Sequence, residues 1–287
     1  MTQPRAELSF FERDDNDQGA LVPTAMARSL WRDDQMHGVA TSGALARRIE
    51  RTVSEAGRGE LVPARYTVDL FRPASMEACR TTATIVREGP RLVLVDAVLS
   101  QRRDGADVPV ARASCLFLAP STEPAGHVWE PSERPGPPPL EVVPVSQGPH
   151  VPWFGSEESD WSQDFRTLQN PGRKATWQTA VPLLVDEEVT PFQAVASIAD
   201  STSMVTNWGS RGVEHINCDI TLTLARRPAG TEIGIAALDR VSSAGIAVGT
   251  AQVYDRQGPL GTSLVTSLAN ARRTVDFTEH DFTGSGA

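Results

Sequence analysis

The sequence predicts an α+β fold in which two tandem antiparallel sheets each wrap around one long helix. Two segments have the apolar spacing of helices, Gly38–Ala56 and Val189–Val205. Valine- and threonine-rich runs that end in turn residues follow each of them, as expected for antiparallel strands. This order of segments recurs about 155 residues later, so the chain reads as two copies of one unit.

The composition excludes several classes of protein. The 287 residues are 40% apolar and carry a net charge of −9. No basic run could track a phosphate backbone, so we expect no nucleic-acid partner. No apolar run approaches the roughly 20 residues that cross a bilayer, and the first residues lack the apolar region of a signal peptide. We therefore expect a cytoplasmic protein without a membrane span.

The cysteines agree with that compartment. Cys79, Cys115 and Cys218 lie far apart and form no CxxC pair, which argues against a zinc ribbon and a redox pair. An odd number of cysteines without a disulfide framework is typical of a reducing compartment. We expect all three side chains to be buried as small apolar groups.

The first half is predicted to begin with a strand at residues 6–12 and an extended piece at 20–31. The helix Gly38–Ala56 follows, and Gly57 ends it. Four further strands come next, bounded by Arg-Pro, Gly-Pro and Asp-Gly turns, at residues 65–71, 77–88, 91–102 and 108–118.

The second helix carries the most informative side chain. Thr190 can cap its start, and Pro191 falls at the first helical position, where the missing N–H costs nothing. Apolar side chains recur at helical spacing from Phe192 to Ala199, and Asp200 stands on or beside that stripe. A carboxylate there is costly to bury unless it is paired or hydrogen-bonded. Asp200 therefore either has hydrogen-bond or ion-pair partners that stabilise the fold, or takes part in a reaction.

A proline-rich stretch separates the halves. Residues 120–152 hold a large share of the 21 prolines, and we expect an extended linker over the surface. A PxxP-type ligand for a partner protein is the functional alternative. We divide the chain into a first unit at residues 1–119, a linker at 120–173 and a second unit at 174–287. The strands of the second unit are predicted at residues 174–185, 216–225, 231–241, 245–255 and 260–269.

Turn residues support the duplication. They recur at offsets of 155, 156 and 153 positions, in the pairs Pro73 and Pro228, Gly89 and Gly245, and Gly105 and Gly258. Moving Asp200 back by 155 positions gives Leu45, so the first half lacks the carboxylate. We expect at most one active site per double unit, with the two sheets joined edge to edge.

The duplicated order of elements and three short motifs resemble a known fold and a known family. A helix, a strand ending in Arg-Pro, a glycine turn and a closing hairpin, all duplicated, resemble the double hotdog fold. The motifs W-x5-HG before the first helix, AxxxD in the second and NxDxTxxLxR after it resemble TesB-like acyl-CoA thioesterases of the bacterial type. The resemblance covers about residues 6–120 and 174–270, but not the linker.

The resemblance implies hydrolysis of an acyl-CoA by an activated water, with no metal and no covalent acyl-enzyme. Coenzyme A is part of the substrate, so no cofactor is implied. The catalytic set of the family is an Asp in the second-half helix, a Thr at the start of the next strand and a Gln in the last strand. The Asp corresponds to Asp200. Counting from Arg226 places the Thr at Asn217, and counting from Gly258 places the Gln at Thr266. Both side chains can still hydrogen-bond a water.

The start of the first helix is the other part of the expected site. A helix N-terminus has unpaired N–H groups that can hold a developing oxyanion. We expect these donors at Gly38 and Val39, with His37 as a candidate for substrate contact. Four arginines are candidates for the phosphates of coenzyme A, although charges at strand ends are usually just solvated: Arg65, Arg72, Arg226 and Arg227.

Two hypotheses remain open. The first is a thioesterase of fatty acid metabolism that cleaves a fatty acyl-CoA to free acid and CoA, with Asp200 as general base and Asn217 and Thr266 as partners. The alternative is a non-catalytic acyl-CoA or lipid-binding homologue, because those two partners depart from the family set. The sequence has no GxSxG elbow, dinucleotide fingerprint or P-loop. The second helix lacks the histidine of a hydratase pattern. Sheet edges would also allow a homodimer.

Overall fold

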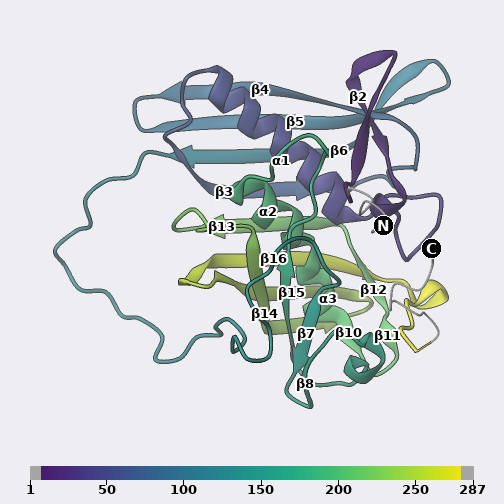
Figure 1. The fold of residues 1–287 in the computed structure, drawn as a ribbon, viewed down its shortest axis with the longest axis vertical. Helices are drawn as coiled ribbons and strands as arrows, with labels where there is room; N and C mark the ends of the chain where they lie inside the picture. The colour runs from purple at the N-terminus through teal and green to yellow at the C-terminus, as the bar shows by residue number, and fades with distance from the viewer. Residues whose placement is uncertain (1–7, 279–287) are drawn as a thin grey trace, which may run out of the picture.

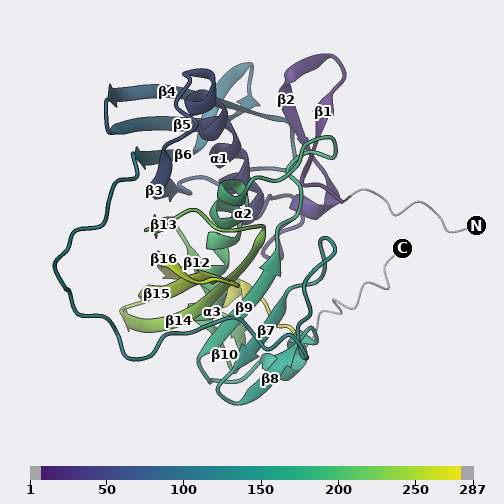
Figure 2. The ribbon, with the colours of Figure 1, turned by 60° about the vertical axis from the view of Figure 1, so that its left-hand side comes forward.

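The computed structural model describes residues 8–278, which form two halves joined in one 14-stranded antiparallel sheet (Figures 1 and 2). Residues 6 and 7 of the predicted first strand lie outside the described residues. In the first half, helix α1 (Gly38–Glu55) packs on strands in the spatial order β1-β2-β4-β5-β6-β3. These are β1 (Phe11–Asp14), β2 (Asp17–Pro23), β3 (Val62–Asp69), β4 (Cys79–Gly89), β5 (Leu92–Arg103) and β6 (Ala106–Leu118), and the short helix η1 (Ala25–Ala27) follows β2.

The second half repeats this order in reverse across space, as β13-β16-β15-β14-β9-β7-β8. Its helical part is α2 (Pro191–Ile198), η3 (Ala199–Ser201) and α3 (Thr202–Asn207). Its main strands are β9 (Lys174–Thr179), β13 (Asp219–Leu224), β14 (Glu232–Ser243), β15 (Ile246–Asp255) and β16 (Gly258–Ala269). The short elements are β7 (Trp153–Ser156), β8 (Ser159–Ser162), η2 (Phe165–Leu168), β10 (Trp208–Gly209), β11 (Gly212–Val213), β12 (His215–Asn217) and η4 (Ala271–Arg273).

The two halves meet where β3 pairs with β13. Thr67 lies opposite Thr221, which is 154 positions later, and the flanking pairs Arg65–Thr223 and Asp69–Asp219 exchange with each other under that offset. The junction therefore lies on an approximate two-fold axis that relates the halves. This register confirms both the predicted duplication and the predicted edge-to-edge joining of the sheets.

Helix α1 has the predicted bounds to within one residue. Its buried face carries Leu45, Ile49 and Val53, and this apolar stripe packs against β4, β5 and β6. The helix ends at the cap Ala56, after which Gly57 has a φ of 73°, a left-handed conformation that favours glycine.

The second helix differs from the prediction of one continuous element over Val189–Val205. It begins as predicted, because the Thr190 hydroxyl accepts from the Gln193 N–H and Pro191 is the first helical residue. It is then interrupted by η3, which contains Asp200. The segment from Asp200 to Ser203 is rich in serine and threonine, whose side chains compete for backbone hydrogen bonds and weaken an α-helix. A 3₁₀ turn of this kind inside a helix often marks a functional position.

Small residues let α1 and α2 cross closely. A Cβ on Gly43 would lie 2.3 Å from Ser197 Oγ, so only glycine fits there. The Ser42 hydroxyl donates to the Ala196 carbonyl at 2.7 Å, and the Tyr66 hydroxyl donates to the Ser42 carbonyl at 2.7 Å. This crossing brings the start of α1 next to η3.

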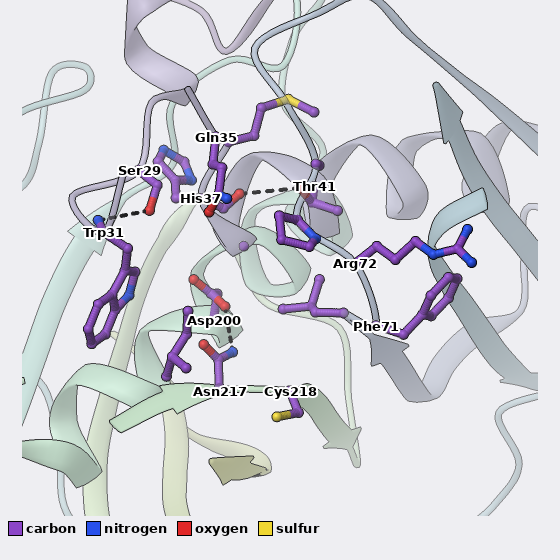
Figure 3. A pocket seen from close by; sticks show the side chains of 16 residues that line it. Ser29, Trp31, Gln35, His37, Thr41, Phe71, Arg72, Asp200, Asn217 and Cys218 are labelled. Carbon is purple, nitrogen blue, oxygen red and sulfur yellow. Dashed lines mark hydrogen bonds between the residues drawn. The ribbon is translucent and has the colours of Figure 1, made fainter. Parts of the chain in front are cut away.

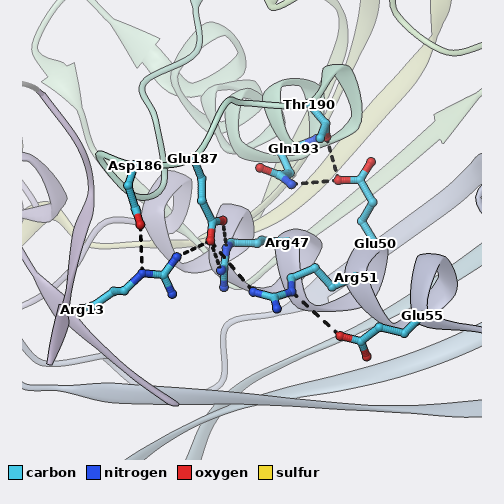
Figure 4. A network of polar contacts seen from close by, with 9 residues as sticks. All are labelled: Arg13, Arg47, Glu50, Arg51, Glu55, Asp186, Glu187, Thr190 and Gln193. Atoms are coloured by element: carbon cyan, nitrogen blue, oxygen red, sulfur yellow. Dashed lines mark hydrogen bonds and ion pairs between the residues drawn. The ribbon is translucent and has the colours of Figure 1, made fainter. Parts of the chain in front are cut away.

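Charged side chains brace the two halves at the other side of this crossing (Figure 4). The buried Arg47 of α1 donates to both carboxylate oxygens of Glu187 at 2.5 and 2.6 Å. Arg13 of β1 contacts Glu187 and Asp186, both in the loop before α2. Glu50 of α1 accepts hydrogen bonds from Thr190 and Gln193 at the start of α2.

Only the first part of the predicted linker lies away from the two halves, and the rest packs against the second half. After β6 it arcs away from both halves in both views (Figures 1 and 2). Arg256 then holds it, since its guanidinium donates to the carbonyls of Pro138 at 3.1 Å and Val143 at 2.9 Å and lies 4.4 Å from the Trp177 ring centroid. From Trp153 onward the chain forms β7 and β8 of the second half. The predicted linker of 120–173 is therefore too long, because aromatic side chains such as Phe154 anchor its last part in the core.

The remaining sequence expectations concern cysteines and membranes. Cys79 and Cys115 are buried, Cys218 is half-buried, and all three are free thiols. Within residues 8–278, none of the helices is both long and apolar enough to cross a lipid bilayer.

Candidate active site

Asp200 lies against the first turn of α1 (Figure 3). A Cβ on Gly38 would be 2.1 Å from Asp200 Oδ1, so only a glycine allows the carboxylate to approach the backbone here. The Val39 N–H donates a hydrogen bond to the carboxylate. Asp200 thus occupies the N-terminus of the helix from the other half, where the partial positive charge of the helix favours an anion.

His37 organises the remaining donors of that turn. As N-cap of α1, it accepts from the Ala40 N–H through Nδ1 at 3.0 Å, and its carbonyl accepts from the Thr41 N–H at 3.3 Å. Because Nδ1 accepts, the ring proton is on Nε2, which donates to the Met26 carbonyl at 2.9 Å. Burial lowers the pKa of His37, which agrees with this neutral form. Among the described residues, none accepts from the Gly38 N–H.

Asn217 is the predicted partner that the structure brings to Asp200. Its Nδ2 donates to Asp200 Oδ1 at 2.9 Å and makes a longer contact of 3.5 Å to the Asp219 carbonyl. It stands at the end of β12, which pairs with β16 beside η3. The second contact fixes the orientation of the amide, so its N–H faces the carboxylate.

Burial raises the pKa of Asp200 to about 6, although the hydrogen bonds from Asn217 and the Val39 N–H act in the opposite direction. A carboxylate with this pKa is ionised at neutral pH and still basic enough to take up a proton. The arrangement therefore suits a general base.

Two cavities meet at the Asp200–Asn217 pair. The larger cavity has a volume of about 240 Å³ and the smaller one about 170 Å³. Both are lined by Asp200, Asn217 and His37. Trp31 and Ser29 also line both, and neither was predicted as a site residue, although Trp31 is the first residue of the W-x5-HG motif. A substrate can thus extend in two directions from the carboxylate.

Thr266 does not join this site, and its prediction as a partner of Asp200 is wrong. The neighbouring positions of β16 face α3, since Ser263 Oγ accepts from the Thr202 hydroxyl at 2.7 Å and Ser267 Oγ accepts from Asn207 Nδ2 at 3.1 Å. Side chains alternate along a strand, so Thr266 lies on the opposite face of the sheet.

The count that led to Thr266 began at Gly258 and crossed a β-bulge. Val253 pairs with Gly261 and Tyr254 pairs with Pro259, so Leu260 is an extra residue in β16. An extra residue changes which side chains face the core, and a count along the sequence does not register it.

The candidate arginines separate into three kinds. Arg226 forms an ion pair with the buried Asp255 at 2.7 Å, and Arg227 donates to the carbonyls of Gly59 and Leu61. Arg65 is exposed on β3 and lines neither cavity. Arg72 alone of the four lines the larger cavity.

The equivalent position at the start of α2 carries different side chains and lines a separate cavity of about 470 Å³. Offsets of 153, 154 and 155 positions carry Asp200 onto Arg47, Ala46 and Leu45, none of which is acidic. The start of α2 is instead occupied by Glu50, which accepts from the Thr190 hydroxyl at 2.7 Å and from Gln193 Nε2 at 2.8 Å. The expectation of at most one active site per double unit stays a prediction.

Comparison with protein families gives two matches that together span both halves. A model of the acyl-CoA thioesterase N-terminal domain matches residues 27–118, and a model of the acyl-CoA thioesterase C-terminal domain matches residues 127–268. No curated protein sequence matches this chain.

Solved structures of similar fold include three of bacterial origin. A tesB protein from Mycobacterium avium subspecies paratuberculosis is 15% identical, with a TM-score of 0.61 over 89% of this chain and 94% of that one. A hot dog fold protein from Alicyclobacillus acidocaldarius is 18% identical, with a TM-score of 0.61 over 87% and 92%. The acyl-CoA thioesterase II TesB2 from Mycobacterium marinum is 13% identical, with a TM-score of 0.52 over 82% and 89%. These likenesses show the double hotdog fold.

Proposed function

This chain belongs to the acyl-CoA thioesterase family and is a thioester hydrolase, and from this premise we propose that it hydrolyses fatty acyl-CoA with a water activated by Asp200. The observation that carries the proposal is the position of the Asp200 carboxylate, at the start of α1 and between two cavities. A thioester that spans both cavities has its carbonyl carbon at this junction.

In the proposed reaction, Asp200 takes a proton from a water while the water oxygen attacks the thioester carbonyl carbon. The C–S bond of the tetrahedral intermediate then breaks, and the protonated Asp200 returns its proton to the CoA thiolate. The products are a free acid and CoA. No metal or cofactor is needed, because the carboxylate supplies the base and the helix supplies the electrostatic stabilisation.

The Gly38 N–H is the proposed donor for the oxyanion. Val39, Ala40 and Thr41 already donate to Asp200, to the His37 ring and to the His37 carbonyl. Gly38 lines the larger cavity and has the remaining N–H of the first turn. One donor of this kind contributes on the order of a hundredfold or more in rate.

Asn217 is proposed to hold Asp200 rather than to react. Its hydrogen bond at 2.9 Å fixes one carboxylate oxygen and leaves the other for the attacking water. The hydrogen bond also favours the ionised form of Asp200, which is the form that accepts a proton.

The proposal is tested by thiol release from acyl-CoA esters of increasing chain length. We expect turnover by the wild type and a loss of about 10²–10⁴-fold in Asp200→Asn, since the amide cannot accept the proton. Asp96→Asn, at an exposed position on β5 that lines neither cavity, is the matched control and keeps full activity. Equal activity in Asp200→Asn would exclude its role as base. Binding without turnover by the wild type would favour the acyl-CoA-binding alternative.

A further inference from the structure

We propose that the smaller cavity holds the acyl group and limits it to short chains of roughly six carbons, with Met204 and the segment from Val275 to Phe277 setting the limit. This inference rests on the proposed thioesterase function. It assigns the acyl group and the CoA part of the substrate to different cavities, and it sets a limit on the length of the acyl chain.

The two cavities differ in the chemistry of their walls. The smaller one is lined by the apolar side chains of Met204, Val213, Val275 and Phe277. Arg28 and the small hydroxyl side chains of Ser29, Ser201 and Ser203 also line it. The larger one contains Gln35, Thr41 and Arg72 among its lining residues. The pantetheine arm of CoA carries amides and ends in phosphates, which match these polar and cationic groups. An alkyl chain is favoured by the apolar walls, because burial removes its surface from water.

The part of the smaller cavity lined by Val213, Val275 and Phe277 belongs to a well-held segment. Val275 and Val213 exchange backbone hydrogen bonds, at 2.9 Å and 3.1 Å, and both side chains are buried. The Phe277 ring centroid lies 4.4 Å from that of Trp208, and its N–H donates to Gln169 Oε1 at 2.9 Å. A longer chain would have to displace these contacts.

The volume sets the scale of the limit. A protein cavity of about 150 Å³ with apolar walls accommodates benzene, which has six carbons. The smaller cavity, at about 170 Å³, therefore has room for a chain of roughly that size. Each methylene that does not fit is expected to reduce kcat/KM by about tenfold or more.

The test measures kcat/KM for acyl-CoA esters from two to sixteen carbons. We expect a maximum near six carbons and a decrease of at least a hundredfold at twelve. A rate at sixteen carbons equal to or above that at six would overturn the inference and leave the proposed function intact. Binding of the matching S-alkyl-CoA thioethers is measured in parallel. Their order of affinity tests the length limit even if no ester is cleaved, so the two proposals fail separately.

Variants locate the limit. Met204→Ala removes part of the wall and is expected to move the maximum to longer chains by roughly three carbons, the number of heavy atoms removed beyond Cβ. Met76→Ala is the matched control, because Met76 is also partly buried against the core but lines neither cavity. An equal shift in both variants, or in neither, would contradict the assignment. Thermal unfolding of both variants checks that each is folded at the assay temperature.

Discussion

Asp200 stands where a helix supplies N–H donors, and its partly buried carboxylate lines two cavities. Burial raises its pKa to about 6, and the hydrogen bond from Asn217 moderates that rise. The same two influences set the pH dependence of the proposed reaction and affect the stability of the folded chain. Three predictions concern single residues at this point.

The first prediction is an acidic limb in the pH profile of kcat/KM. Asp200 must be ionised to act as base, so activity is expected to rise with pH through a midpoint near 6. Asn217→Ala removes a hydrogen bond that lowers this pKa and is expected to move the midpoint to higher pH. Cys218→Ala, the neighbouring position in the larger cavity, should leave the midpoint unchanged. A midpoint that Asn217→Ala does not move would show that a different group titrates.

The second prediction concerns stability. The pKa of Asp200 is raised from its ordinary value of 3.8 to about 6 on folding, so its contribution to stability is full below pH 4 and is lost as the pH rises through 6. Asp200→Asn stays neutral and is expected to increase the free energy of unfolding by about 3 kcal/mol at pH 8. Urea unfolding at pH 8 and at pH 4.5 measures the effect. An equal gain at both pH values would contradict the pKa shift as its cause.

The third prediction concerns Gly38. In Gly38→Ala the new Cβ would lie 2.1 Å from Asp200 Oδ1, so the carboxylate must move. We expect kcat/KM to fall by about a hundredfold, because a displacement near 1 Å has that effect on a catalytic group. Gly59→Ala is the control, since its Cβ would have no neighbour within 4 Å. A rate like that of the wild type would mean that the contact is not needed.

At the scale of elements, the loop before α2 is held to α1 by the ion pair of the buried Arg47 with the half-buried Glu187. Both guanidinium hydrogen bonds reach the same carboxylate, and Arg47 together with Arg13 lowers the pKa of Glu187 to about 2. The contribution of Glu187 to stability is therefore present above its ordinary value of 4.5 and is lost only as the pH falls toward 2.

Removing this carboxylate leaves a buried guanidinium without a counter-charge. Glu187→Gln is expected to lower the free energy of unfolding by about 2–4 kcal/mol at pH 7. Glu55→Gln breaks the exposed contact with Arg51 at 4.0 Å and should change stability by less than about 0.5 kcal/mol. Chemical denaturation of both variants gives the comparison. Similar losses in the two would mean that burial does not strengthen the Arg47 pair.

The sequence was most informative about elements with a regular period. Helix α1 and the cap at Thr190 follow from apolar spacing and capping chemistry, and the long strands follow from their turns. Apolar spacing does not reveal the break at η3, because it continues through Ile198 and Ala199. The serines and threonine that follow Asp200 are the local signal of the break. The high proline content before β7 predicts a linker, whereas β7 pairs with β9 and so belongs, together with β8, to the second half.

At the scale of the whole molecule, the halves are expected to unfold together. They share the β3–β13 pairing, and one cluster of buried apolar side chains includes Leu45 of the first half and Val195 of the second. Scanning calorimetry should therefore give a single transition with equal calorimetric and van't Hoff enthalpies. Two resolved transitions would show that each half has an independent core.

The site also shows how far sequence reasoning extends at this scale. Asp200 could be found because it is a costly carboxylate that breaks the symmetry of a repeat. Asn217 followed from a short count of nine positions back from Arg226, whereas the count to Thr266 crossed the bulge at Leu260. The cavities bring together residues from both halves, and Ser29 carries no signal of its role in the sequence.

The pairing of Thr67 with Thr221 on the two-fold axis has a consequence for how such a chain can vary. In a symmetric pair of identical subunits, every substitution appears at both helix starts at once. A covalent double unit removes that constraint, so one helix start can receive Asp200 while the other receives Glu50. Joining the copies in one chain thus doubles the number of positions that can vary independently around the two equivalent helix starts. One helix start can then serve the reaction while the other stabilises the fold.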